Sequence, residues 1–257
     1  MLERQSKATE EMRAKWRKET VAERIERISL ETYDICKGRV KYGPFKGLKL
    51  NRDTWWGRSD LGSQCLGLYE KEVLNLIVEN GPYETFIDIG AADGYYAVGM
   101  LYSQLAKNAV CFEITQKGQE AIKNNWALND SVGSIVIHGE ADIKSITSAL
   151  SSIPQKSLVL IDIEGFEFGL LQSDILCLLK NCQVIIEVHN WVDDFQEKYT
   201  QLLTNIAQFF DINPLERIER ETTCIPELAS YTDDNRLLVT SERRPCLMRF
   251  LHLTPIK

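Results

Sequence analysis

The sequence predicts an α/β protein built on a doubly wound, mostly parallel β-sheet. Between residues 84 and 210, short apolar runs alternate with helical patterns, which is typical of parallel strands joined by crossover helices. The runs are apolar throughout instead of alternating apolar with polar residues, as expected for strands that helices cover on both faces. The length of 257 residues suits one large domain with a small extension.

The predicted elements follow one another in a regular order. An amphipathic helix at 69–78 comes first, and five strands then alternate with five helices. The strands are predicted at 84–90, 109–114, 133–139, 157–163 and 182–188. The helices are predicted at 95–106, at 116–128, from Ile143 onward, at 166–180 and at 193–210.

The C-terminal segment predicts an antiparallel end to the sheet. Residues 211–222 read as a strand, and residues 235–253 read as one or two more strands with no helix between them. Strands that follow one another without a crossover helix pair antiparallel. We therefore expect a Rossmann-like sheet of seven strands with an antiparallel C-terminal hairpin.

The N-terminal segment predicts a charged helical extension. We assign residues 1–45 to this arm and residues 46–257 to the main domain. Ala14, Val21 and Ile28 recur every seven residues and give the arm one narrow apolar stripe. Two interpretations stay open, a helix packed on its own domain and an arm that forms a homodimer.

Composition and charge argue against several classes of protein. The net charge of −7 and the pI of about 5.2 disfavour a nucleic-acid ligand, because proteins that bind phosphate backbones present a basic face. No apolar run is long enough for a membrane span. The charged N-terminus lacks the apolar core of a signal peptide, which predicts a cytoplasmic location. Seven cysteines without a CxxC pair predict free thiols.

Acidic residues stand where the predicted strands end. Ligands of a doubly wound sheet bind beyond the carboxyl ends of its strands. A carboxylate inside an apolar run is unfavourable unless it serves a ligand or finds a partner. The candidate residues at these ends are Asp88, Gly90, Ala91, Asp93 and Gly94, then Glu113, then Glu140, Ala141 and Asp142, then Asp162 and Glu164, and finally Glu187, His189 and Trp191.

The turn after the first strand, DIGAADG, favours a cationic ligand over an anionic one. It carries Gly90 and Gly94, but Ala92 stands where a dinucleotide-binding turn needs its middle glycine. Asp88 and Asp93 add negative charge to the same turn. The pyrophosphate of a dinucleotide is therefore a poor match for this site.

Further residues fit an adenosine with a positively charged tail. Glu113, at the end of the second strand, can accept both ribose hydroxyls, and Asp142 can accept the adenine amino group. Tyr96 follows the glycine turn and is expected to face the same ligand. S-adenosylmethionine combines these parts. The pattern resembles the class I, Rossmann-like methyltransferases, whose cofactor is S-adenosylmethionine.

A second stretch narrows this resemblance. SLVLIDIEGFEFGLL, followed by QVIIEVHN, resembles the FkbM family of methyltransferases. Asp162, Glu164, Gly165 and Glu167 match the D-x-E-G-x-E turn of that family, and the resemblance covers about residues 80–195. It implies methylation of a hydroxyl oxygen, with a saccharide or a glycosylated small molecule as the acceptor.

Transfer of a methyl group to an alcohol needs a group that removes the hydroxyl proton. The ordinary pKa of histidine suits a general base, so His189 is a candidate, and Asp162 and Glu164 are the alternatives. The other interpretation of His189 is a side chain that orients a carboxylate. Asp162, Glu187 and His189 together also suit a hard divalent cation such as magnesium, so a metal stays open.

Aromatic residues ahead of the sheet are candidates for acceptor binding. Trp55 and Trp56 are neighbours in a polar loop, where they can stack on a sugar or close over a sulfonium ion. The alternative is a loop that tucks both rings against the domain. Glu187 and Trp191 complete the predicted acceptor site.

Two other functions compete with a methyltransferase. One is an NAD-dependent oxidoreductase, which the missing middle glycine disfavours. The other is a non-catalytic, Rossmann-like binding protein whose charged arm recruits partners. It would bind no adenosyl ligand, or bind one without turnover.

Overall fold

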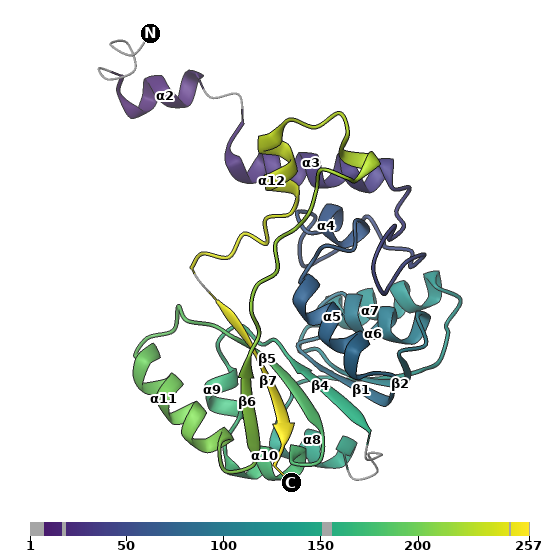
Figure 1. Cartoon of the computed structure of the whole chain (residues 1–257), viewed down its shortest axis with the longest axis vertical. Helices are drawn as coiled ribbons and strands as arrows, with labels where there is room; N and C mark the ends of the chain where they lie inside the picture. The colour runs from purple at the N-terminus through teal and green to yellow at the C-terminus, as the bar shows by residue number, and fades with distance from the viewer. Residues whose placement is uncertain (1–7, 17–18, 151–155, 247, 257) are drawn as a thin grey trace.

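The structure, a computed structural model, describes residues 8–16, 19–150, 156–246 and 248–256. Its centre is a seven-stranded sheet in the order β3-β2-β1-β4-β5-β7-β6 (Figure 1). Strands β1 to β5 pair in parallel, and β7 runs antiparallel to both β5 and β6. The predicted fold class is confirmed, including the antiparallel C-terminal hairpin.

The observed elements lie close to the predicted ones. The strands are β1 Tyr83–Ile89, β2 Ala106–Phe112, β3 Ser134–His138, β4 Ser157–Ile161, β5 Gln183–Val188, β6 Phe210–Pro214 and β7 Arg249–Pro255. The helices are α2 Glu10–Trp16, α3 Val21–Ile35, α4 Leu61–Cys65, α5 Lys71–Asn80, α6 Tyr95–Tyr102, α7 Gln116–Leu128, α8 Ile143–Leu150, α9 Glu167–Leu170, α10 Ser173–Leu179, α11 Phe195–Ile206, the 3-10 helix η1 Pro226–Leu228 and α12 Asp233–Val239. Within the described ranges, no helix combines the length and the apolar character that a membrane crossing requires.

Two apolar clusters hold the layers together, one on each face of the sheet. In β1, Phe86 packs with α5 and α6, whereas its neighbour Ile87 packs with α8, α10 and α11. In β4, Leu158 belongs to the cluster of Phe86, and Val159 belongs to the cluster of Ile87. Because successive strand residues point to opposite faces, continuous apolar strands fill both clusters. Each fully buried side chain of this kind contributes about 1.5–3 kcal/mol.

Several predicted helices have different limits in the structure. The helix expected at 95–106 ends at Tyr102, because Ala106 begins β2. The helix expected at 166–180 is two helices, α9 and α10, because the chain turns at the fully buried Leu171. The helix expected at 193–210 is shorter, since Phe210 begins β6.

The prediction of a helix-free C-terminal segment is wrong, and the strand expected at 211–222 ends at Pro214. Helix α12 lies between β6 and β7, beside α3 (Figure 1). The Thr232 side chain caps it by accepting the backbone N–H of Asn235 at 3.3 Å, and acidic residues in its first turn suit the positive end of the helix. Val239 anchors it in the core. The apolar Leu-Leu-Val run predicts a strand, but the Thr232 cap in front of it favours a helix.

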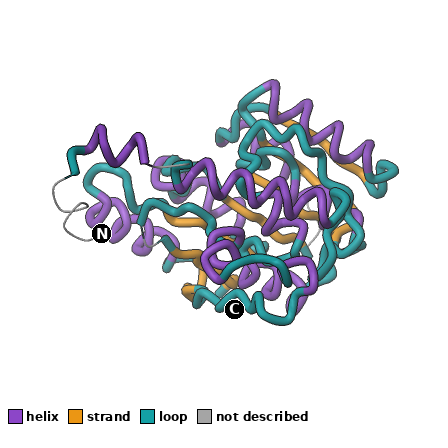
Figure 2. The backbone as a smooth tube through the Cα atoms, turned by 90° about the horizontal axis from the view of Figure 1, so that it is seen from above, coloured by secondary structure: helices purple, strands orange, loops and turns teal. Residues whose placement is uncertain are grey.

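Helix α3 packs on the main domain. Ile25, Ile28 and Thr32 are buried at helical spacing, and the Thr32 hydroxyl lies 2.9 Å from the Tyr231 hydroxyl. Of the seven-residue stripe, Ile28 is buried but Val21 is 65% exposed, so the spacing of seven does not define the buried face. Helix α2 stands away from the body in two perpendicular views (Figures 1 and 2). Residues 1–7 and 17–18 of the arm lie outside the described residues, and a homodimer stays a prediction.

Gly90 permits the close approach of two central strands. It has a φ of +93°, and a Cβ atom there would lie 1.7 Å from the backbone oxygen of Asp162. The turn after β1 therefore contacts the end of β4 through a position that no side chain can occupy. This contact brings the glycine turn next to the acidic residues after β4.

Gly90→Ala is expected to lower the free energy of unfolding by about 3 kcal/mol, because backbone strain and a steric clash add up. Gly169→Ala is the matched control, since a Cβ atom there meets no heavy atom within 4 Å. Urea denaturation of both variants and the wild type checks this. Equal stability of the two variants would show that the turn relaxes without penalty.

Candidate functional site

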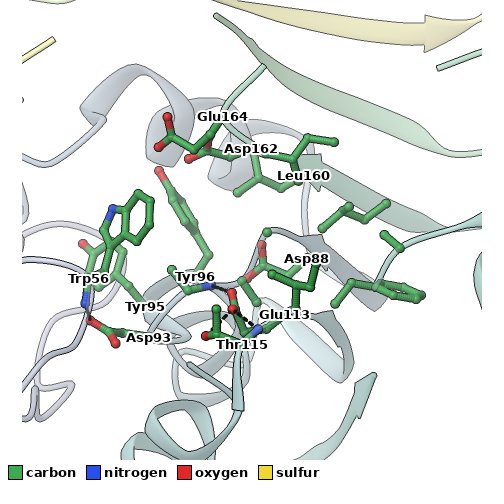
Figure 3. Close-up of a pocket in the computed structure, with 18 of the residues that line it drawn as sticks. Trp56, Asp88, Asp93, Tyr95, Tyr96, Glu113, Thr115, Leu160, Asp162 and Glu164 are labelled. Carbon is green, nitrogen blue, oxygen red and sulfur yellow. Dashed lines mark hydrogen bonds between the residues drawn. The ribbon is translucent and has the colours of Figure 1, made fainter. Parts of the chain in front are cut away.

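A cavity of about 600 Å³ lies at the carboxyl ends of β1, β2 and β4 (Figure 3). The strand order reverses at this point, since β1 has β2 on one side and β4 on the other. Ligands of doubly wound sheets bind at such a switch point. The volume lies in the range of about 300–1,000 Å³ that is usual for small-molecule sites.

Carboxylates and aromatic rings dominate the wall of this cavity. Among the described residues that line it there is no lysine, arginine or histidine. A wall of this kind favours a cation and disfavours a phosphate. The lining acids are Asp60, Asp88, Asp93, Glu113, Glu140, Asp162 and Glu164. The lining aromatic residues are Trp55, Trp56, Tyr69, Tyr95, Tyr96, Phe112 and Phe166.

Asp88 is the acid placed deepest in the sheet. It is 3% exposed, and burial, together with the nearby Asp162 and Glu113, raises its pKa to about 8. The backbone N–H of Ala97 offsets this rise only in part. A carboxyl group in this position carries a proton at neutral pH unless a positive charge arrives beside it.

Glu113 holds the glycine turn from the end of β2. Its Oε2 accepts the backbone N–H of Ala92 at 3.1 Å, and its Oε1 accepts the N–H and hydroxyl of Thr115 at 2.8 and 2.7 Å (Figure 3). A carboxylate has about four acceptor positions, so one stays open for a ligand hydroxyl. Gly118 makes room for this side chain, because a Cβ atom there would lie 2.6 Å from the Glu113 Cδ.

Asp93 connects the glycine turn to the tryptophan loop. Its carboxylate accepts the backbone N–H groups of Trp55 and Trp56 at 3.3 and 3.5 Å. Burial raises the pKa of Asp93 to about 6, although these two N–H donors lower it. The two indole rings meet edge to face at 5.5 Å, and Trp56 is 50% exposed. The tryptophan loop thus forms one side of the cavity.

His189 lies directly behind the cavity wall. Its Nε2 is 3.3 Å from the Asp162 Oδ1 and 3.7 Å from the Glu164 Oε2. On the other side, the Glu167 Oε1 accepts the His189 backbone N–H at 2.8 Å and lies 3.2 Å from its Nδ1. Burial alone lowers the pKa of this imidazole, but Asp162 and Glu167 raise it to about 9. His189 is therefore an imidazolium at neutral pH.

Most of the predicted site residues meet at the cavity. Figure 3 shows Asp162 and Glu164 across it from Asp93 and Glu113. The predicted residues that line it are Trp55, Trp56, Asp88, Gly90, Ala91, Asp93, Tyr96, Glu113, Glu140, Ala141, Asp162 and Glu164.

Five predicted residues lie outside the cavity wall. Gly94 begins α6 in the left-handed conformation and packs against Ile122. Asp142 is exposed and accepts the backbone N–H of Ser145 at 2.6 Å. The other three lie behind the wall or beside it, namely Glu187, His189 and Trp191.

Some residues of the wall were not predicted from the sequence. Ile114 and Phe166 are 70% and 76% exposed, although both are apolar and line the cavity. Their signal is an apolar residue placed within a few positions of a strand-end acid. Gly118 has a signal too, a glycine inside a helical pattern, which often marks a packing requirement.

Two groups of three side chains have the donor types of a divalent-cation site. The first group is Asp162, Glu164 and His189, and the second is Glu70, Asp162 and Glu187. Within each group, the potential ligand atoms lie within 4.8 Å of one another. In the first group, the carboxylates of Asp162 and Glu167 favour a proton on His189, which a metal ion would have to displace. In the second, the Arg244 guanidinium already contacts Glu70 and Glu187. Each group thus already lies against a positively charged side chain of the protein, an imidazolium or a guanidinium.

The comparisons with known proteins give structural matches alone. No family model matches the chain, and the comparison with curated proteins gives no match. An O-methyltransferase from Bacillus cereus, determined in complex with SAH, shares 12% identity at a TM-score of 0.49, over 72% of this chain and 80% of that one.

Two further solved structures have similar values. An rRNA methylase from Streptococcus thermophilus shares 8% identity at a TM-score of 0.47, over 71% of this chain and 93% of that one. A precorrin methyltransferase from Geobacter metallireducens shares 10% identity at a TM-score of 0.45, over 82% and 94%. Identities and TM-scores this low carry no argument about function, which has to come from the site.

Protonated His189 is expected to make the stability depend on pH. Its folded-state pKa of about 9 lies above the ordinary value, so its contribution is complete below about pH 6.5 and is lost as the pH rises through 9. Between pH 6 and 9.5 the wild type should lose about 3 kcal/mol more unfolding free energy than His189→Gln. Urea denaturation across this range checks it. Parallel pH profiles would contradict the imidazolium assignment.

Proposed function

We propose that this protein is an S-adenosylmethionine-dependent methyltransferase that acts on a hydroxyl oxygen. The observation that carries the proposal is the wall with seven acidic side chains at the carboxyl edge of a doubly wound sheet, with no basic residue among the described residues that line it. A sulfonium ion is stabilised by such a wall, whereas the pyrophosphate of NAD would face like charges. Because S-adenosylmethionine is a methyl donor, we assign the protein a function in methylating an acceptor molecule.

The cofactor is assigned to the cavity by its three chemical parts. The ribose goes to Glu113, whose one free acceptor position suits one of its hydroxyl donors. The adenine goes beyond it, between the exposed apolar side chains of Ile114 and Phe166. Asp142 stays a candidate for the adenine amino group. The sulfonium end goes to the glycine turn beside Asp88.

Asp162 is proposed as the general base. It lies in the cavity wall, whereas His189 is 1% exposed and stands behind it. As the new carbon–oxygen bond forms and the carbon–sulfur bond breaks, Asp162 takes the hydroxyl proton of the acceptor. His189 positions the Asp162 carboxylate from behind at 3.3 Å. Glu164 is the alternative base on the same side of the cavity.

A saccharide is proposed as the acceptor. The resemblance of Asp162, Glu164, Gly165 and Glu167 to the FkbM turn implies sugar-linked hydroxyls. The half-exposed ring of Trp56 supports it, because an aromatic face beside polar groups suits a ligand that is apolar on one side and polar on the other.

Calorimetric titration tests the cofactor assignment. S-adenosylmethionine and S-adenosylhomocysteine are expected to bind the wild type, and NAD is expected not to. Glu113→Gln should weaken both adenosyl ligands by about 1.5–3 kcal/mol, because a charged hydrogen-bond acceptor is lost. Glu120→Gln, an exposed acid on α7, is the matched control and should bind like the wild type. Binding of NAD without adenosyl ligands would favour the oxidoreductase instead.

The base assignment is tested by turnover on mono- and oligosaccharide acceptors. Asp162→Asn should reduce kcat by about 10²–10⁴-fold, because the proton acceptor is removed. His189→Gln should reduce kcat less, since His189 touches Asp162 and not the acceptor. The rate of S-adenosylhomocysteine release measures both. A larger loss in His189→Gln would transfer the role of base to the imidazole.

A further inference from the structure

We propose that Arg244 is a built-in cation at the carboxyl edge of the sheet, in the place that a divalent metal would take, and that it is a positioning residue for the cavity. The part of this inference that concerns cofactor affinity rests on the proposed function. The part that concerns cation binding does not.

The first observation is a cluster of three carboxylates. Ligand atoms of Glu70, Asp162 and Glu187 all lie within 4.8 Å of one another. Glu70 and Glu187 are 2% and 4% exposed, so water screens them little. Like charges this close in a low-dielectric surrounding repel one another strongly, and they persist only if a cation or a proton compensates them.

The second observation is the position of the Arg244 guanidinium. Its Nη2 lies 3.2 Å from the Glu70 Oε1, its Nη1 contacts the Glu187 Oε1, and its Nε donates to the Glu242 Oε2 at 3.0 Å. The side chain is 14% exposed and stacks over the Phe250 ring at 5.2 Å. The planar fork of an arginine can serve three carboxylates at once.

The third observation concerns the further contacts of Glu70 and Glu187 with side chains at the cavity. Glu70 accepts the hydroxyl of Tyr96 at 2.6 Å, and Tyr96 lines the cavity. The Glu187 Oε2 lies 3.8 Å from the Nε2 of His189, which stands behind the wall. One guanidinium therefore fixes two side chains from separate elements, each of which supports a different part of the cavity. This arrangement is what a metal ion would supply in an oxygen-rich site.

The experiment titrates Mn²⁺ alone, with calorimetry and electron paramagnetic resonance as readouts. The wild type and Arg217→Gln should bind Mn²⁺ equally weakly. Arg217 is a matched control, because it also pairs with Glu242, at 3.6 Å, but is 56% exposed. Arg244→Ala should bind Mn²⁺ at least about tenfold more tightly than the wild type, since the carboxylates lose their cation. Tight Mn²⁺ binding by the wild type, or no gain in Arg244→Ala, would overturn the proposal.

Arg244→Lys is a second variant that tests the proposal if Arg244→Ala does not fold. A lysine keeps one charge but cannot bridge both carboxylates. This variant should show no gain in Mn²⁺ binding, and a gain would overturn the proposal. Thermal melting of each variant identifies those that fold.

Rescue of cofactor affinity by an added cation distinguishes a charge-compensating role of Arg244 from a merely structural one. S-adenosylhomocysteine should bind Arg244→Ala at least about tenfold more weakly than the wild type, and Mn²⁺ or guanidinium should restore part of the loss. The same additions should leave Arg217→Gln unchanged. A loss that no cation restores would contradict the proposal. Failure of the wild type to bind S-adenosylhomocysteine would overturn the proposed function, and the Mn²⁺ titration would still decide on Arg244.

Discussion

The repulsion among carboxylates at one edge of the sheet is the constraint on which the rest of this structure depends. Seven acids line a single cavity, and further acids stand behind its wall. Burial of a charge without a partner is far more unfavourable than the whole stability of a domain allows. The surrounding chain therefore compensates several of these acids, and it does so in different ways. Glu113 and Asp93 accept backbone N–H groups, Asp162 lies against an imidazolium, and Glu70 and Glu187 share one guanidinium.

Among the buried acids of the cavity, Asp88 has the fewest compensating partners. Burial and two nearby carboxylates raise its pKa, and one backbone N–H works against them. A cationic ligand in the cavity would ionise Asp88 and gain an ion pair with it, so ligand charge and site charge are coupled. The compensated acids keep their places without a ligand. The cavity thus has its shape without a ligand, but Asp88 lacks a positively charged partner. This is the physical basis for proposing a sulfonium compound as the ligand.

The sequence predicts the sheet well, because apolar strands and strand-end acids are local signals. Helix α7 begins and ends at the predicted residues, and the carboxylates of Asp88, Glu113 and Asp162 reach one cavity since parallel strands end at one edge. Other contacts have no local signal. Glu70 and Arg244 are 174 residues apart, so their pairing appears only after the chain has folded. Helix α12 differs from the prediction for another reason, because its short Leu-Leu-Val run resembles a strand while the Thr232 cap and the acidic first turn favour a helix.

The D-x-E-G-x-E turn shows how one short motif can serve two purposes. Asp162 and Glu164 face the cavity, whereas Glu167 is fully buried behind it and accepts the N–H groups of Gly165 and His189. Gly165 has a φ of +100°, which lets the chain reverse direction between the two kinds of acid. The first two acids suit chemistry, and the third fixes the turn and the imidazole that positions Asp162. The spacing of the motif therefore follows from geometry, because the three acids must reach opposite sides of one wall.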